Sequence, residues 1–169
     1  MKSLNRLASA HGTFCTIFDT LRSPFLLAVR LYWGWQFVQT GLGKLRHLPR
    51  VVDFFASLNI PLPWLNAHFV AGLEFFGGML LIIGLFSRPI SLMFTGSMLV
   101  AYWTAEHEAL ASIFSDPGKF YTADSYTFLF AALLILIFGP GLFSLDALLA
   151  KRFPSYMQTP HRGMDAVVN

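Results

Sequence analysis

Charged side chains are scarce in this 169-residue sequence, at 12%, while 55% of the residues are hydrophobic and the mean hydropathy is +0.57. This balance excludes an ordinary soluble domain. Cysteine is nearly absent, because Cys15 is the single example, so a disulfide or a CxxC redox pair within one chain is excluded. The sequence also lacks a glycine-rich phosphate loop, a nucleophile elbow, a haem-attachment motif and histidine pairs suited to haem.

Four apolar blocks dominate what is present, at residues 24–42, 67–86, 89–105 and 126–145. Each has about the 20 residues that a helix needs to cross a bilayer. Glu74 is the one charged residue in the last three blocks, and none of the blocks has the alternation of a strand. We therefore predict an all-α, polytopic membrane protein: a bundle of four transmembrane helices with short interfacial helices.

The flanking segments complete the predicted organisation. Residues 1–21 form a cytoplasmic or interfacial segment, either a surface helix or a disordered tail; residues 22–150 form the membrane domain; residues 151–169 form a cytoplasmic tail. Ser23-Pro24 predicts the start of the first helix. Residues 50–58 predict a short interfacial helix, and Gly139-Pro140-Gly141 predicts a kink in the fourth span.

Basic residues lie mostly beside the membrane ends, so the net charge of +3 reflects topology and not nucleic-acid binding. With four spans, both termini share one side. The excess on that side predicts that both termini are cytoplasmic. The residues on the two sides are Lys2, Arg6, Arg22, Arg88, Lys151, Arg152 and Arg162, against Lys44, Arg46, Arg50 and Lys119.

Two stripes at helical spacing are expected to face each other. One contains Arg30, Gly34, Phe37, Gly41 and Lys44; the other contains Glu74, Gly78, Leu81, Leu85 and Arg88. Small residues allow membrane helices to approach closely. The predicted packing glycines are Gly34, Gly41, Gly77, Gly78 and Gly84.

Arg30 and Glu74 are predicted to pair inside the membrane. A lone charge at mid-bilayer costs at least about 2.5–3.5 kcal/mol, so each needs a partner or a wet cavity. Three roles stay open: a structural clamp, a site for an anionic or quinone-type ligand, and snorkelling to lipid headgroups.

A polar pocket is predicted around this pair and the outer end of the bundle. Its candidate residues are Gln36, Gln39, Lys44, His68, Tyr102, Trp103, Glu106, His107 and Glu108. The histidines and glutamates lack metal-ligand spacing, and residues 106–108 point in three directions on a helix. We therefore expect a solvated helix end there and no metal site.

The stripes and turns resemble those of the DoxX family of small four-helix bacterial membrane proteins. The resemblance covers about residues 24–151. It is carried by Arg30-x3-Gly34-x2-Phe37-x3-Gly41-x2-Lys44-Leu45, Asn59-Ile60-Pro61, Glu74-x2-Gly77-Gly78-x-Leu80-x3-Gly84-Leu85-x2-Arg88, and Gly139-Pro140-Gly141 with Ser144-Leu145-Asp146. Asn59 stands where family members often have glycine, and asparagine tolerates the left-handed conformation.

The resemblance implies a bacterial inner-membrane accessory subunit of a redox complex, linked to quinone and to a protein partner that carries the redox centres. It implies no covalent cofactor; a bound quinone or lipid is the expected ligand. The alternative is a non-enzymatic partner of a peptide- or metal-handling or export system. A stand-alone enzyme is the third and least favoured reading. The 18 phenylalanines suit lipid contact and homo-oligomerisation equally.

Overall fold

The structure, a computed structural model, describes the backbone of residues 2–152 and the side chains of Phe14 and residues 20–152. Over this range the chain is helical and contains no strand, which confirms the all-α prediction for the described residues. The elements are α1 (Lys2–Arg46), α2 (Leu48–Ser57), α3 (Pro63–Gly72), the π-helical turn η1 (Leu73–Gly77), α4 (Gly78–Ile83), α5 (Ser87–Thr104), α6 (His107–Ala111), α7 (Pro117–Thr122), α8 (Asp124–Phe138) and α9 (Leu145–Arg152).

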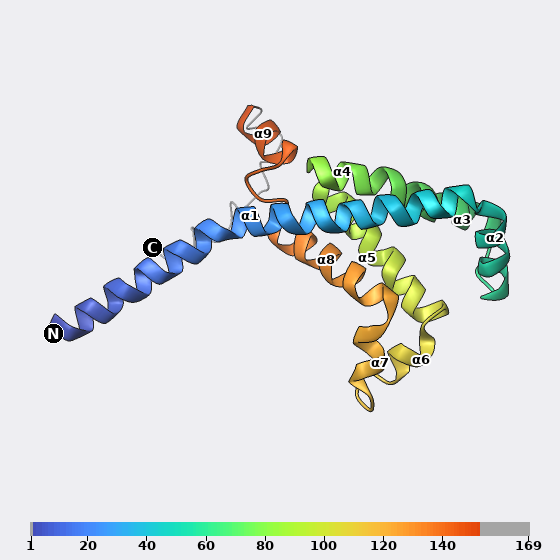
Figure 1. Ribbon diagram of the computed structural model, residues 1–169, viewed down its shortest axis with the longest axis horizontal. Coiled ribbons are helices and arrows are strands. Elements are labelled where there is room, and N and C mark those ends of the chain that lie inside the picture. Colours follow the sequence, from blue (N-terminus) through green and yellow to red (C-terminus); the bar gives the residue numbers. More distant parts are fainter. Residues whose placement is uncertain (1, 153–169) are drawn as a thin grey trace, which may run out of the picture.

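The long helices pack side by side into one bundle (Figure 1). α1 lies along the second helical stretch, formed by α3, η1 and α4, and also contacts α8, while α5 packs against α8. The centre of the bundle is aromatic and aliphatic: the rings of Phe37 and Phe94 stack with their centroids 3.7 Å apart, and Leu81, Ala132 and Ile135 are fully buried around them. This core holds α1 against the second stretch, where the site lies.

Most of each predicted apolar block lies in a helix of the bundle, whereas residues 84–86 and 139–144 lie in the turn after α4 and the loop after α8. Within the described residues, one helical stretch, Pro63–Ile83, is long and apolar enough to cross a membrane by length and composition. The apolar α8 has 15 residues and is shorter than that requirement. The number of crossings therefore stays a prediction.

The predicted helix start at Ser23-Pro24 is wrong. α1 begins at Lys2 and continues through Pro24, and its N-terminal part extends beyond the other helices (Figure 1). Proline removes a single backbone donor. A helix of 45 residues keeps its other backbone bonds on both sides of that position. Residues 2–21 are helical, but as a continuation of α1 and not as a separate short helix, so their location on the membrane surface stays a prediction.

Two helices end in turns that need a left-handed residue. After α4, Gly84 has φ +72°, and its N–H donates to Leu81 O while Leu85 N–H donates to Leu80 O. After α2, Asn59 has φ +56°, the left-handed conformation that asparagine tolerates. Both turns have the hydrogen-bond pattern of a Schellman motif, which satisfies carbonyls at the helix end.

Gly139-Pro140-Gly141 ends the fourth long helix and does not kink it. Gly139 has φ +78° and ψ −176°, a conformation that is essentially restricted to glycine, so α8 cannot continue past Phe138. The chain then turns through a loop of residues 139–144 into α9. The predicted C-terminal tail lies outside the described residues from residue 153 onward.

Short helices lie at the opposite end of the bundle, with α2 apart from α6 and α7 (Figure 1). The helix predicted at residues 50–58 is present as α2, and Pro61 and Pro63 separate it from α3. α6 and α7 occupy the connection between α5 and α8. α2 therefore forms a separate wall beside the second helical stretch.

Candidate functional site

The two predicted stripes face each other, and glycines set their separation. A Cβ added at Gly78 would lie 2.8 Å from Gly34 O, and a Cβ added at Gly41 would lie 2.8 Å from the carbonyl carbon of Glu74. Real side chains do not tolerate such contacts with backbone. The glycines therefore bring α1 against the second helical stretch at Gly78 and again at η1.

Arg30 lies at one end of this contact and is 1% exposed. Its Nε donates to Leu81 O at 3.1 Å, Nη1 donates to Pro140 O at 2.5 Å, and Nη2 donates to Ile82 O at 3.2 Å and Phe143 O at 3.0 Å. None of these four acceptors is a carboxylate. Cations are favourable at a helix C-terminus, where carbonyls lack intrahelical donors. Arg30 therefore joins α1, the end of α4 and the 139–144 loop, and we call this set the carbonyl clamp.

The predicted Arg30–Glu74 pair is wrong. The guanidinium binds carbonyls at residues 81 and 82, seven or eight positions beyond Glu74, which corresponds to about 10 Å along a helix. Those carbonyls satisfy its donors at the end of α4, so the cation does not need the carboxylate. The three roles were predicted for the Arg30–Glu74 pair; the structure gives Arg30 a clamping arrangement with backbone carbonyls in place of Glu74.

Asp146 supports the same end of the bundle, a role that the sequence analysis did not assign. Its carboxylate accepts hydrogen bonds from Phe86 N and Ser87 N, both at 2.9 Å, at the start of α5. Its own N–H donates to Gly84 O at 2.9 Å. A carboxylate at a helix N-terminus is favourable. Asp146 belongs to the Ser144-Leu145-Asp146 motif of the family resemblance, to which the sequence analysis gave no function.

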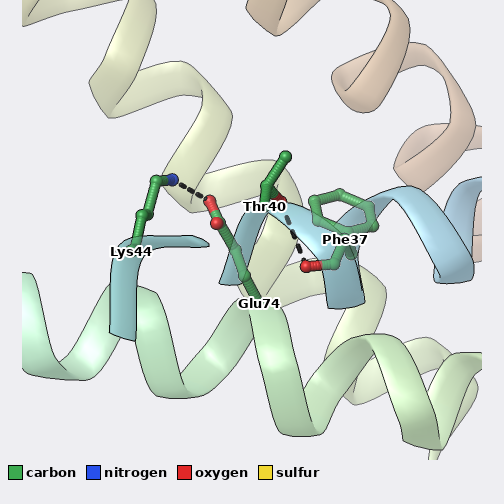
Figure 2. Close-up of polar contacts among 4 residues, drawn as sticks. All are labelled: Phe37, Thr40, Lys44 and Glu74. Carbon is green, nitrogen blue, oxygen red and sulfur yellow. Dashed lines mark hydrogen bonds and ion pairs between the residues drawn. The ribbon is translucent and has the colours of Figure 1, made fainter. Parts of the chain in front are cut away.

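Glu74 pairs with Lys44, at the other end of the contact. Lys44 Nζ lies 2.5 Å from Glu74 Oε1, and Figure 2 shows the two side chains pointing toward each other from α1 and η1. The Glu74 side chain is 2% exposed and that of Lys44 is 33% exposed. Glu74 Oε2 is buried and has no hydrogen-bond partner among the described residues. Glu74 also sits in the π-helical turn, a feature often found at functional sites.

Two cavities meet at this pair. The first, the α2–α5 cavity, has a volume of about 650 Å³. It is lined by Lys44, Arg50, Val51, Phe54, Phe55, Leu58, Ile60, Pro61, Asn66, Phe69, Val70, Glu74, Gly96, Ser97, Met98, Val100, Ala101, Thr104 and Ala105. Its walls are mainly apolar, and charged groups are few. Such a cavity has the size and lining of small-molecule sites in proteins.

The second, the α1–α8 cavity, has a volume of about 550 Å³ and a larger share of hydroxyl groups. Its lining residues are Phe37, Thr40, Lys44, Glu74, Met98, Ala101, Tyr121, Thr122, Ala123, Asp124, Ser125, Thr127 and Phe128. Four residues line both cavities: Lys44, Glu74, Met98 and Ala101. The ion pair therefore stands between an apolar space and a more polar one.

Lys44 and Glu74 line these cavities, whereas the other predicted pocket residues do not. Gln36, Gln39, His68, Tyr102, Trp103, Glu106, His107 and Glu108 are absent from both linings. Tyr102 is buried and donates to Phe120 O at 2.8 Å, and His68 Nδ1 lies 2.7 Å from Trp64 O. The Glu106 Oε2 atom is buried without a hydrogen-bond partner in the described part of the chain, while His107 and Glu108 are exposed. Of the predicted pocket residues, Lys44 and Glu74 therefore border the two cavities described here.

Comparisons with known proteins give one family and two relatives. The sequence model of the family described as DoxX matches residues 25–107. The inner membrane protein YphA of Escherichia coli (strain K12) is 28% identical over 135 residues, covering 76% of this chain and 93% of that protein. A Bacillus subtilis (strain 168) protein named "Putative oxidoreductase CatD" is 26% identical over 125 residues, covering 74% and 87%. No solved structure matches.

Proposed function

We propose that this chain, which belongs to the DoxX family and is a membrane protein, is an accessory subunit that binds a quinone or a lipid-like amphiphile in the α2–α5 cavity. The observation that carries the proposal is a charged pair, Lys44–Glu74, at a mainly apolar cavity of about 650 Å³. Apolar walls accommodate a chain or ring, and the few polar groups fix its orientation. The location that we propose is a bacterial inner membrane, with both termini cytoplasmic.

The surroundings of the cavity favour a ligand that arrives from the bilayer. Phe54, Phe69 and Val100 line the cavity and are 52%, 53% and 53% exposed. Exposed apolar side chains in a membrane protein can lie against lipid without the cost that water imposes. A lipid-soluble molecule can therefore pass along these side chains toward the ion pair.

The redox part of the proposal concerns a partner. A protein named "Putative oxidoreductase CatD" is among the relatives, and a bundle of this kind needs a redox centre elsewhere to pass electrons onward. The chain would hold the amphiphile, while the partner would supply the oxidation or reduction. Cross-linked complexes purified from the native membrane test this part: an oxidoreductase subunit with a redox cofactor is expected, and recovery of peptide- or metal-export subunits alone would contradict it.

Ligand binding is tested with decylubiquinone and a pair of glycine variants. Gly96 lines the α2–α5 cavity, and a Cβ there would meet no atom within 4 Å; Gly72 is equally open but lines neither cavity. Gly96→Phe should fill the space and weaken binding at least about tenfold, whereas Gly72→Phe should bind like the parent protein. Binding is measured by microscale thermophoresis in detergent, together with extraction of co-purified quinone. Absence of both saturable binding and extractable quinone would refute the quinone part.

A further inference from the structure

The unpartnered oxygen of Glu74 indicates what kind of head group the cavity accepts. Glu74 is 1% exposed, and its Oε1 is bonded to Lys44, whereas Oε2 has no hydrogen-bond partner among the described residues. Burying a carboxylate oxygen without a donor is costly. Glu74 lines both cavities, so its side chain borders the space that a ligand would occupy.

We propose that Glu74 Oε2 accepts a hydrogen bond from the ligand, so that the site selects amphiphiles whose head group carries an O–H or N–H donor. This inference rests on the proposed function, since it requires an amphiphile in the α2–α5 cavity. A carboxylate cannot donate, so it cannot bond to a head group that offers only acceptors. A carbonyl or ether at the same place would leave Oε2 without a donor and would bring two electronegative oxygens together.

Lys44 completes the recognition of such a head group. Its ammonium has three donors, of which one is bonded to Glu74 Oε1. A hydroxyl that donates to Oε2 still has lone pairs that can accept from this ammonium. A phenol, a quinol or an alcohol can therefore donate to Glu74 and accept from Lys44 with one hydroxyl. A quinone can only accept from Lys44.

The main test compares two ligands that differ in one donor, 4-decylphenol and its O-methyl ether, on the full chain in detergent. Both have the same ring and tail, so their apolar contacts with the cavity walls should be the same. The phenol is expected to bind at least about tenfold more tightly, because hydrogen bonds to charged groups are among the stronger ones in proteins. Equal binding of both compounds would overturn the inference and leave the proposed function standing. Failure of both compounds and of decylubiquinone to bind would refute both.

A second carboxylate in the chain provides a matched control. Glu106 Oε2 is also buried without a hydrogen-bond partner in the described part of the chain, but Glu106 lines neither cavity. Glu74→Gln should reduce the phenol-to-ether affinity ratio to about threefold or less, because a neutral amide is a weaker acceptor. Glu106→Gln should keep the ratio of the parent protein. A ratio that survives Glu74→Gln, or that is lost in Glu106→Gln, would overturn the assignment of Glu74.

Photo-cross-linking locates the ligand without any substitution. A decylphenol with a diazirine in its tail should label peptides from α2 or α5, which contribute Phe55 and Met98 to the cavity lining. Excess unmodified phenol should suppress this labelling, and excess methyl ether should suppress it at least about tenfold less effectively. Labelling confined to α9 and the 139–144 loop would place the compound at the other end of the bundle and overturn the inference, even if Glu74→Gln fails to fold.

Discussion

The two ends of the helix contact should be energetically independent, and double-mutant cycles can measure this. The proposed cycles use Arg30→Met, Lys44→Met and Glu74→Gln, alone and in pairs. Lys44 and Glu74 are in direct contact, with Nζ and Oε1 2.5 Å apart. Contacting residues couple by about 0.5–3 kcal/mol. One third of the Lys44 side chain is exposed, so solvent screens the pair and we expect about 1–2 kcal/mol.

Arg30 and Glu74 should show almost no coupling. The guanidinium binds carbonyls about 10 Å along the helix from Glu74, and Lys44 already neutralises the carboxylate. Sites more than 7–10 Å apart usually add to within about 0.5 kcal/mol. Arg30→Met alone should still cost at least about 3 kcal/mol, because it leaves four carbonyl acceptors without this donor.

Unfolding with sodium dodecyl sulfate in mixed micelles, followed by circular dichroism and tryptophan fluorescence, supplies the free energies. Equal transitions with both probes would establish that two-state values can be used. A coupling between Arg30 and Glu74 as large as that between Lys44 and Glu74 would refute the separation of the two ends. A loss below about 1 kcal/mol for Arg30→Met would refute the carbonyl clamp.

Three further predictions use the same unfolding measurement. Gly41→Ala should destabilise the bundle by about 1–3 kcal/mol, because its Cβ would meet the backbone of η1, whereas Gly43→Ala, with no atom within 4 Å, should not; equal effects would contradict the close approach. Gly84→Ala should cost at least about 2 kcal/mol, since it forces a left-handed alanine against the carbonyl clamp; a neutral result would contradict that contact. Asp146→Ala should cost about 1–2 kcal/mol and Asp146→Asn less, because asparagine can still cap α5; equal losses would argue against capping.

The sequence was sufficient to predict the facing stripes but not their register. Helical spacing and small residues identify which faces meet. The partner of each charge depends on how far one helix is shifted along the other. Gly34 lies against Gly78 and Gly41 lies against η1, so each step along α1 toward Lys44 is a step back toward Glu74 on the antiparallel helix. An alignment of the two helices by their facing glycines places Glu74 near Lys44. The sequence prediction instead estimated the depth of each charge from the ends of the apolar blocks, and this favoured Arg30 as the partner of Glu74.

The acceptors of Arg30 and the cavity wall were not predictable from local pattern. Every residue has a backbone carbonyl, so the residue types at positions 140 and 143 do not reveal that their carbonyls bind Arg30. The predicted polar pocket combined side chains by their distance from the membrane end, but residues at one depth can lie on different faces of the bundle. α2 was predicted as an interfacial helix, and its role as a wall beside the ion pair depends on tertiary packing.

The carbonyl clamp has a consequence for the order in which the chain is made. Arg30 is synthesised early, but two of its four acceptors, Pro140 O and Phe143 O, come from a loop that follows more than 100 residues later. In a nascent chain that stops before Gly139, at most two of these four carbonyls, Leu81 O and Ile82 O, could accept hydrogen bonds from Arg30. We therefore expect completion of the last long helix and its loop to complete the binding of Arg30. Ribosome-bound intermediates of this chain should depend on the insertion machinery until that point.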